Sequence, residues 1–530
     1  MKFANRIICV AVACAMALTS CVKSSEMEFH EVERIALQAW IEQHRPDLLE
    51  NYQEDGGYYV ELLDRGVADS LPVSDDNAWL WFDVTCRDLS GNVCLTRDAD
   101  QARMQNAYTE YTHYVPFFLF CGKDNTSMLE GTHMALRNKL KIGDEEYAVR
   151  YGTKMRLYLP SSIAAGPQGM GGDGGYEGQY KLDADRPMIV DVNVWGHINN
   201  PVAYEDQWVK SFATLNGGLA PEDEDDKAAK LRRTYMRPVS RAEGDDAEEE
   251  VVYDDMWHLA VDSIAGLYIN YKYTPKKGLD FDCLRSDTLL YSGQTGYTRG
   301  KLYGTKSLEQ INKEIDDALL ERFGDGLDPA DAEPMDSTDV AKIWYVARLL
   351  DGFVVDTNIP EIKKIVYPEE EVDEDDEEEA YEFTTDQEND TSSTSNRVDA
   401  WRYGFPQLKL GAWNVILSVS SNAYGATGVA GTTTTSSGSS NYYNPYYDYY
   451  NYYNYYNSYY GNSYYNNYYN NYYYDYYYNN YYNSYYYNNY LYGNSTSTDE
   501  TEVVTVTEIQ PYTPLIWQVY VEERETEEEE

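Results

Sequence analysis

Positive charge is scarce in this sequence. Its 530 residues include 42 Lys and Arg against 90 Asp and Glu, which gives a formal net charge of −48. Nucleic-acid-binding proteins contact phosphates through clustered Lys and Arg, so the composition argues against a nucleic-acid partner. Much of the negative charge lies in runs that are typical of solvated, disordered segments, and none of these runs has the spacing of an EF-hand calcium loop. The runs lie at residues 222–226, 245–250, 369–379 and 527–530.

Cysteine and histidine are also scarce, with seven and six residues. No CxxC or Cys/His ligand spacing occurs, which argues against a zinc site, and the chain has too few cysteines for a disulfide scaffold. Cys86 and Cys94 flank the turn at residues 89–91, and two alternatives stay open for them: a disulfide between paired strands, or two buried free thiols. A GxGxxG string begins at Gly169 but does not open a helix after a strand, so a flexible loop is favoured over a dinucleotide site.

The N-terminal apolar run, residues 7–18, is too short to span a bilayer. Residues 18–21 read Leu-Thr-Ser-Cys, and small residues before a cysteine resemble the lipobox of bacterial lipoproteins. The resemblance implies a signal peptide at 1–20, acylation of Cys21 and a lipid anchor in the cell envelope. Val22, which follows Cys21 where an Asp would favour the inner membrane, implies the outer membrane by the same resemblance. The periplasmic and the surface face both stay open. The alternative is an ordinary cleaved signal with an incidental cysteine.

Three changes in composition divide the remaining chain. Residues 217–250 form an acidic linker, and residues 369–396 form an acidic, Ser/Thr-rich insertion. Residues 432–500 are a low-complexity insertion built mostly of Tyr and Asn, which resembles prion-like polar and aromatic tracts. We expect both insertions to be disordered, because neither composition can form an ordinary packed core.

Hydrophobic periodicity predicts strands and few helices between these segments. Strands are predicted at 58–63, 80–85, 155–159, 188–194, 267–273, 343–349, 414–419 and 515–521. Helices are predicted at 31–44 and 308–323, and the capping box formed by Ser127 and Glu130 predicts another that ends near residue 140. Several strands around few helices favour an α+β fold over an alternating βαβ fold.

Five segments of the second half carry a family resemblance. They read AKIWYVARLLDGFVVDT at 341–357, VDAW at 398–401, FPQLKLG at 405–411, SNAYGATG at 421–428 and EIQPYTPLIW at 508–517. Their order and spacing resemble FKBP-type peptidyl-prolyl cis-trans isomerases. The resemblance implies an antiparallel sheet wrapped on a short helix in an isomerase domain at 251–525, with its core at 335–368, 397–431 and 503–522.

The same resemblance implies the catalytic residues of that domain. They are the strand tyrosine Tyr345, Asp356 of the Phe-Asp pair, Val398 with its backbone N–H, the floor tryptophan Trp401, the flap tyrosine Tyr424 and the closing aromatic Trp517. Val355 stands where the family has Phe, so one aromatic wall is reduced. Such a site acts on X–Pro bonds and needs no cofactor and no metal, and its expected partners are proline-containing unfolded or nascent exported polypeptides. The alternative is that these aromatic residues only form a core.

The first half, residues 21–216, resembles a degenerate copy of the same domain. Positions that match the family's tyrosine, Phe-Asp pair, tryptophan, flap tyrosine and closing aromatic hold Thr85, Cys94-Leu95, Thr132, Ala165 and Val190. Small side chains cannot clamp a proline ring, so this copy is expected to be a scaffold or a binding module. Two functions therefore stay open: an extracytoplasmic prolyl isomerase with one active copy, and a non-catalytic peptide-binding or surface-structural lipoprotein.

Overall fold

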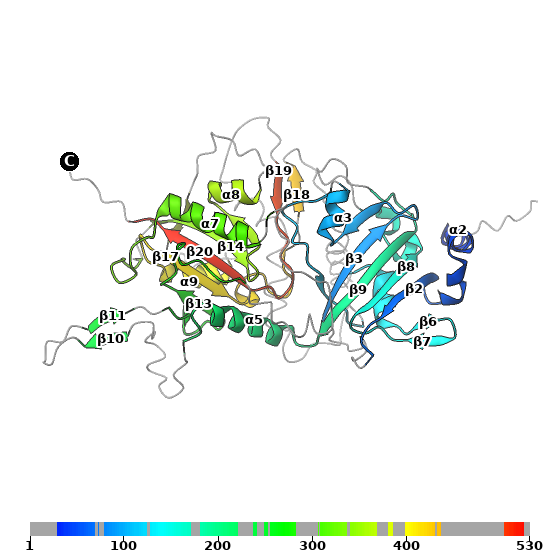
Figure 1. Ribbon diagram of the computed structural model, residues 1–530, viewed down its shortest axis with the longest axis horizontal. Coiled ribbons are helices and arrows are strands. Elements are labelled where there is room, and N and C mark those ends of the chain that lie inside the picture. The colour runs from blue at the N-terminus through cyan, green and yellow to red at the C-terminus, as the bar shows by residue number, and fades with distance from the viewer. Residues whose placement is uncertain are drawn as a thin grey trace, which may run out of the picture.

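The chain forms two antiparallel sheets that lie side by side, with α5 (Pro201–Leu215) running along the side between them (Figure 1). The computed structural model describes residues 29–68, 73, 79–105, 107–123, 128–170, 181–220, 237–240, 249–252, 255–281, 306, 308–335, 340–367, 380–384, 398–429, 432–435 and 503–523. We refer to residues 29–198 as the first half and to residues 201–523 as the second half.

Each half contains a seven-stranded sheet. The first sheet consists of β1 (Tyr52–Gln53), β2 (Tyr58–Arg65), β3 (Trp79–Arg87), β4 (Val93–Thr96), β5 (Phe117–Phe120), β8 (Thr153–Leu159) and β9 (Met188–Ile198). The second consists of β12 (His258–Leu259), β13 (Leu267–Asn270), β14 (Val340–Leu349), β15 (Val354–Thr357), β16 (Tyr381–Thr384), β17 (Trp413–Ser418) and β20 (Leu515–Val521).

The two sheets have the same strand order. The first runs β1-β2-β8-β9-β3-β4, with β5 also paired to β3, and the second runs β12-β13-β17-β20-β14-β15, with β16 also paired to β14. In both sheets the last strand in sequence, β9 or β20, lies in the interior, between two strands that precede it in the chain. All of these pairings are antiparallel, which confirms the α+β class.

Helices and short ladders complete the described residues. The helices are α2 (Phe29–His44), α3 (Ala99–Met104), α4 (Glu130–Arg137), α5, α7 (Leu308–Phe323), α8 (Pro360–Val366) and α9 (Asp399–Gly404). The 3-10 turns are η1 (Pro46–Asn51), η2 (Ser161–Ile163), η3 (Gly166–Gln168), η7 (Phe405–Gln407) and η8 (Ser420–Asn422). The ladders pair β6 (Leu140–Ile142) with β7 (Glu145–Tyr147), β10 (Arg237–Ser240) with β11 (Glu249–Val252), and β18 (Thr432–Thr435) with β19 (Val503–Val506).

The predicted capping box does not open α4. The helix begins at Glu130, its N-cap is Leu129, and no side chain caps it. It ends at Arg137, and Leu140 already belongs to β6, while Ser127 lies outside the described residues. Packing sets the position of this helix instead, since a Cβ built on Gly131 would lie 2.7 Å from the side chain of Leu159. Close approach of a helix to a strand is a common reason for glycine at such a position.

Parts of the segments expected to be disordered form strands. The ladder of β10 and β11 lies in the C-terminal part of the acidic linker and extends two residues past it, β16 lies inside 369–396, and β18 opens the Tyr/Asn-rich insertion. Tyr381 and Phe383 alternate with polar residues along β16, and this alternation is the strand signal that the neighbouring acidic run obscures. The rest of both insertions lies outside the described residues.

The two halves share one apolar core. A single cluster of buried residues joins Trp81, Phe118 and Trp195 of the first half to α5 and the second sheet. Within α5, Trp208 and Phe212 are buried in this cluster. A separate cluster fills the first sheet. Helix α5 thus belongs to the core of the second half although it precedes the acidic linker.

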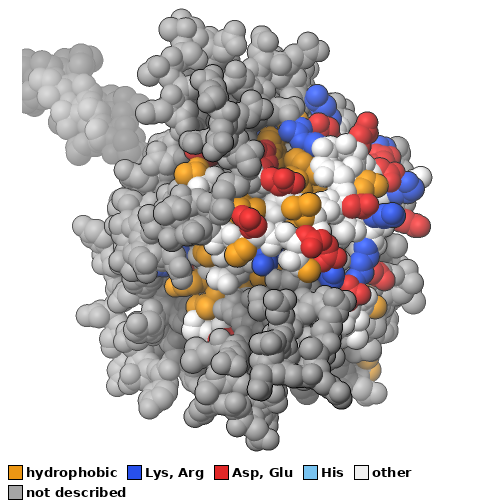
Figure 2. Space-filling view, turned by 90° about the vertical axis from the view of Figure 1, so that its left-hand side faces the viewer, with side chains coloured by type: hydrophobic (Ala, Val, Ile, Leu, Met, Phe, Trp, Pro, Cys, Tyr) orange, Lys and Arg blue, Asp and Glu red, His pale blue; other side chains and the backbone are white. Residues whose placement is uncertain are grey.

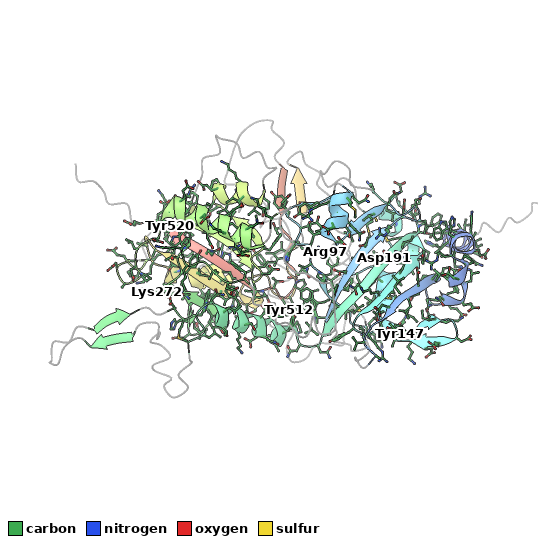
Figure 3. The ribbon with its side chains drawn as sticks, in the orientation of Figure 1. Arg97, Tyr147, Asp191, Lys272, Tyr512 and Tyr520 are labelled. Atoms are coloured by element: carbon green, nitrogen blue, oxygen red, sulfur yellow. The ribbon has the colours of Figure 1, made fainter. Side chains whose placement is uncertain are left out.

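Polar contacts also join the halves, near the labelled Arg97 and Tyr512 (Figure 3). The side-chain amide of Gln510 accepts from the Phe118 N–H at 2.6 Å and donates to the Pro116 carbonyl at 3.0 Å. Tyr111 of the first half stacks on Tyr367, which follows α8, with ring centroids 4.2 Å apart. The two Gln510 hydrogen bonds satisfy backbone groups at and beside β5 that would otherwise be buried without partners.

The described surface of the second half carries both signs of charge. Seen from its end, acidic and basic side chains lie interspersed (Figure 2). Lys272 pairs with Asp328 and Lys277 with Asp255, each at 2.9 Å. No helix among the described residues is long and apolar enough to cross a membrane, and Cys21 lies outside them.

Candidate active site

The candidate site begins where β14 turns into β15. Gly352 has φ +88°, a conformation that glycine adopts without strain, and it closes the Leu-Leu-Asp-Gly turn. The returning strand pairs Asp356 with Ala347, two residues along β14 from Tyr345. The Tyr345 hydroxyl donates a hydrogen bond of 2.7 Å to Oδ2 of Asp356. Sequence and register together therefore bring two of the predicted site residues into contact.

Asp356 is exposed as a residue, yet its carboxyl group is closely surrounded by protein atoms. Burial raises the pKa of this carboxyl above its ordinary value, while the Tyr345 hydroxyl, Lys363 and the Thr357 backbone N–H lower it. The carboxyl group orients the Tyr345 hydroxyl by accepting its hydrogen bond.

Trp401 forms the apolar floor beside Tyr345. Helix α9 starts after its N-cap Val398, and Trp401 lies in its first turn with 5% of its surface exposed. Its ring meets Tyr345 edge-on at 5.0 Å and stacks on Phe405 at 4.7 Å. Edge-to-face and stacked rings are favourable arrangements, so the indole is held in one orientation.

The other three predicted residues belong to the same buried cluster or pack against it. Trp517 lies in β20 opposite Ala347 and is 2% exposed. Val398 caps α9 and is 7% exposed. Tyr424 follows η8 in a tight turn, is half-buried and packs against the cluster. Direct contacts therefore join Tyr345, Asp356 and Trp401.

Two residues of this site were missed by the sequence analysis. The Tyr381 ring lies 5.2 Å from the Trp401 ring, and the Phe405 ring stacks on Trp401 and meets Tyr381 edge-on at 6.4 Å. Tyr381 was overlooked because it falls in the range expected to be a disordered insertion. The aromatic pair on β16 was the available signal, since Phe383 also packs on Phe405 at 5.4 Å. Trp401 therefore has aromatic neighbours although Val355 stands where the family has Phe.

The equivalent positions in the first half follow from the shared register. Cys86 pairs with Val190 as Ala347 pairs with Trp517, and Val84 pairs with Val192 as Tyr345 pairs with Val519. Val84, not Thr85, is therefore the counterpart of Tyr345, and the match to Thr85 was wrong by one residue. A shift of one residue along a strand moves a side chain to the other face.

The remaining counterparts stand where they were expected. Thr132 is the third residue after the N-cap of α4, as Trp401 is in α9. Ala165 is the second residue after η2, as Tyr424 is after η8. Thr132 and Ala165 are both buried and small. The described first half thus has no aromatic cluster at the equivalent place.

Cys86, Cys94 and Cys121 are buried, and none of the three forms a disulfide among the described residues. Between the two alternatives for Cys86 and Cys94, the register decides for free thiols, because Cys86 pairs with Leu95 across a β-bulge. The Cys94 thiol instead contacts the Cys86 carbonyl at 3.4 Å. Burial raises the pKa of Cys94 and of Cys121 to about 12, so both thiols are inert at neutral pH.

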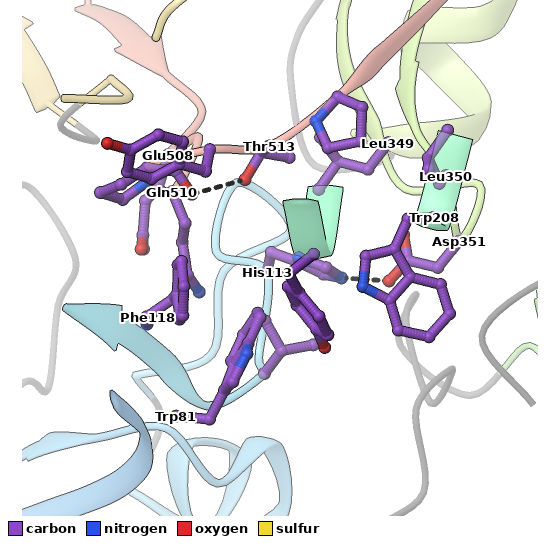
Figure 4. A pocket seen from close by; sticks show the side chains of 15 residues that line it. Trp81, His113, Phe118, Trp208, Leu349, Leu350, Asp351, Glu508, Gln510 and Thr513 are labelled. Carbon is purple, nitrogen blue, oxygen red and sulfur yellow. Dashed lines mark hydrogen bonds and ion pairs between the residues drawn. The ribbon is translucent and has the colours of Figure 1, made fainter. Parts of the chain in front are cut away.

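A cavity of about 70 Å³ lies between the halves (Figure 4). Trp81, Phe118, Trp208 and Tyr512 form its aromatic walls. The His113 ring, which stacks on Phe353 at 4.5 Å, faces the Asp351 carboxylate with 2.9 Å between Nε2 and Oδ2. The cavity is large enough for a few waters and is bounded mainly by the interface between the halves.

Searches of protein-family models and of curated proteins gave no match. Solved structures match, and they are FKBP-type peptidyl-prolyl isomerases. One is the peptidyl-prolyl cis-trans isomerase of Pseudomonas syringae pv. tomato, with 18% identity over 32% of this chain and 94% of that chain and a TM-score of 0.21. The three FKBP domains of wheat FKBP73 match over 89% of this chain and 95% of that chain, with 11% identity and a TM-score of 0.19. FkpA of Escherichia coli matches over 35% and 71%, with 14% identity and a TM-score of 0.20.

The described residues contain no group of three or more His, Cys, Asp or Glu arranged to hold a metal ion. The GxGxxG string does not open a helix in the described part of the chain: Met170 forms a β-bridge with Leu182, and residues 171–174 lie outside the described residues.

Proposed function

We propose that the chain is a peptidyl-prolyl cis-trans isomerase that acts on X–Pro bonds through the site around Trp401. The observation that carries the proposal is the contact set of Tyr345, Asp356 and Trp401, surrounded by Tyr381 and Phe405. A flat, rigid aromatic floor next to an oriented hydroxyl suits the apolar ring and polar flanks of a prolyl peptide.

Prolyl isomerisation requires few functional groups from such a site. Rotation about a peptide bond meets a barrier of about 18–20 kcal/mol because resonance gives the bond partial double-bond character. The two isomers of an X–Pro bond differ by only about 0.5–1 kcal/mol, so the catalyst need only lower the barrier. Apolar, water-excluding surroundings disfavour the charge-separated planar amide more than the twisted one.

Each residue has a defined role in this proposal. Trp401, Tyr345 and Trp517 hold the proline ring, while the Val398 N–H and the Tyr424 hydroxyl hold the carbonyl groups on either side. Asp356 orients the Tyr345 hydroxyl by accepting its hydrogen bond. No nucleophile, metal or cofactor takes part, because no bond other than the rotating amide changes its character.

We extend the proposal to the rest of the chain. The common strand order supports two FKBP-like copies, of which the first is a non-catalytic scaffold or binding module. The lipobox-like residues before Cys21 support an envelope lipoprotein, with the outer membrane favoured. Its substrates would then be proline-containing exported polypeptides that have not yet folded.

A second candidate function is a non-catalytic peptide-binding or surface-structural lipoprotein. Val355 favours it, because this side chain replaces one aromatic wall of the family's pocket and leaves fewer contacts for a proline ring. The aliphatic positions of the first half favour it as well.

Isomerisation kinetics of a short X–Pro tetrapeptide with the full mature chain test the proposal. We expect catalysis, and we expect Trp401→Leu to lower kcat/KM by roughly tenfold or more, since the floor contact is lost. Thr132→Ser at the equivalent position of the first half is the matched control and should leave kcat/KM unchanged. Peptide binding without catalysis by the unmutated chain would favour the second function, and the absence of both would reject the two proposals.

A further inference from the structure

Helix α5 carries a carboxylate on its apolar face. The buried side chains of α5 recur at helical spacing, and Glu205 lies among Tyr204, Trp208 and Val209 with 3% of its surface exposed. Burial of a carboxylate is costly unless hydrogen bonds replace its hydration, so its partners show what holds it there. Burial raises the pKa of Glu205 to about 7, while hydrogen bonds from Ser420 lower it and the nearby Asp206 raises it.

The partner of Glu205 is the turn that leads to Tyr424. The Ser420 backbone N–H donates to one carboxylate oxygen of Glu205, and the Ser420 hydroxyl donates to the other at 2.8 Å. The Ser420 carbonyl accepts in turn from the N–H groups of Ala423 at 2.8 Å and Gly425 at 2.7 Å. These two residues flank Tyr424 on both sides. A continuous set of hydrogen bonds therefore connects α5 to the backbone that carries the flap tyrosine.

We propose that Glu205 is a positioning residue for the isomerase site, which fixes the Tyr424 turn through Ser420. The inference rests on the proposed function. It assigns a role to α5, which lies outside the five segments that carry the family resemblance. An oriented side chain needs a supporting contact to hold its geometry within a fraction of an ångström, and a buried two-point contact supplies one.

The first half has the same contact between a buried glutamate and a serine, but without a tyrosine in the turn that follows. Glu33 of α2 is 7% exposed, and it accepts from the Ser161 N–H at 2.6 Å and from the Ser161 hydroxyl at 2.7 Å. The Ser161 carbonyl accepts from the Ala164 N–H at 3.0 Å, directly before Ala165. Ala165 has neither ring nor hydroxyl. The Glu33 contact therefore serves as an internal control, because its loss should affect the structure of a turn but not the isomerase site.

Kinetics on the full mature chain test the role of Glu205. We expect Glu205→Ala to lower kcat/KM on the order of tenfold, Glu205→Gln to keep most of the activity because its amide oxygen can still accept from Ser420, and Glu33→Ala to leave kcat/KM unchanged. Tyr424→Phe should lower activity, and adding Glu205→Ala to it should cost little more, since both changes act on one group. Full activity in Glu205→Ala, or multiplied losses in the double variant, would overturn the proposal.

A second measurement separates this proposal from the proposed function. Amide hydrogen exchange of Ala423 and Gly425 should become on the order of tenfold faster in Glu205→Ala than in Glu205→Gln, while the amides of β14 stay unchanged. If the unmutated chain proves inactive but this exchange pattern appears, the isomerase proposal fails and the positioning of the turn stands. Equal protection of the two amides in the Glu205→Ala variant and the unmutated chain means that Glu205 does not position the turn.

Discussion

The guanidinium of Arg97 and the carboxylate of Glu508 form an ion pair 2.7 Å long between the two halves, with 3% and 6% of the side chains exposed. The two residues are 411 positions apart in the sequence. Arg97 also donates to the carbonyls of Val115 and His113 and lies over the Phe117 ring at 4.2 Å. Every side of the guanidinium thus has a partner, and the pair ties the end of β4 to the segment that leads into β20.

Loss of one member of this pair should destabilise the whole chain. We expect Arg97→Met to lower the free energy of unfolding by about 3–5 kcal/mol, because the Glu508 carboxylate is left buried without its partner. Arg97→Met with Glu508→Leu should recover much of that loss. Urea unfolding of the mature chain gives both values. Arg65→Met is the matched control, since Arg65 and Glu145 form an exposed pair at 2.8 Å, where a change of at most about 1 kcal/mol is expected.

Stability should fall as the pH rises from about 4.5 to about 7. The pKa of Glu205 increases from 4.5 to about 7 on folding, so the folded state binds more protons than the unfolded state in that window. The effect of this one group is about 3 kcal/mol, and it is constant above pH 7. Urea midpoints at pH 5, 6, 7 and 8 should decline less steeply for Glu205→Gln than for the unmutated chain.

Asp83 provides a comparison for that pH profile. Burial raises its pKa to about 6, partly offset by its hydrogen bond from Trp195. Asp83→Asn should therefore flatten the decline only below about pH 6, whereas Glu205→Gln should flatten it up to about pH 7. The same slope for Glu205→Gln and the unmutated chain between pH 6 and 7 would contradict the assigned titration.

Restoring an aromatic wall should increase isomerase activity. Val355 directly precedes Asp356 on β15 and is 8% exposed, and we expect Val355→Phe to add ring contacts to a bound proline. We expect kcat/KM to rise several-fold, and we expect Val355→Ala to lower it. Thermal unfolding of each variant shows whether the larger ring overpacks the core. A loss of activity in a Val355→Phe variant that melts normally would mean that the valine belongs to a different substrate specificity.

Membrane attachment should depend on Cys21. Acyl chains supply most of the membrane affinity of a lipid-anchored protein, so Cys21→Ser should move the chain from the membrane fraction to the soluble fraction. Cell fractionation followed by immunoblotting measures this. Cys121→Ser, which alters a buried thiol, is the control and should stay with the membranes. A Cys21→Ser variant that remains membrane-bound would contradict the interpretation of residues 18–21 as a lipobox.

The Tyr/Asn-rich tract should hold large substrates near the site. It is inserted at the open end of the ladder in which Thr432 pairs with Val506 and Thr435 pairs with Val503. Replacing residues 442–492 by a short Gly/Ser linker should leave isomerisation of a tetrapeptide unchanged and weaken catalysed refolding of a proline-limited protein, because tyrosine offers amphipathic contacts to unfolded chains.

A tract of the same length with Ser in place of Tyr is the control for this replacement. If the tyrosines hold the substrate, the Ser variant should behave like the short linker. If both variants keep full refolding activity, the tract is an inert expansion of a loop, which long loops tolerate because closure entropy grows slowly with length.

Most of the fold was predictable because its elements carry local patterns. Alternation along β2, β8 and β20 and the helical period of α7 predicted these elements with nearly correct ends. The contact of Tyr345 with Asp356 was predictable from the turn at Gly352, since a tight turn fixes which residues face each other. The positions in the first half were predicted correctly where a turn or a helix start marks them.

The rest of the site depends on relations that no local pattern contains. Val84 replaces Thr85 as the counterpart of Tyr345 because pairing with β9, far along the chain, fixes the register. Tyr381 stands on a strand of four residues, whose alternation is obscured by the acidic run beside it. Glu205 lies 215 positions before Ser420, and a single acidic residue on an apolar helix face does not indicate its partner.

The central place of β20 has a consequence for how the protein is made. This strand is the last described element in the sequence, and it pairs with β14 on one side and β17 on the other. Synthesis delivers the chain from its N-terminus, so β14 and β17 emerge with their facing edges open until residues 515–521 follow. The first half can complete its sheet as soon as β9 has emerged, whereas the second sheet is completed only when β20 has emerged. A ribosome that stalls anywhere in the Tyr/Asn-rich tract would leave two unpaired strand edges, which are sites for aggregation or for a holding chaperone.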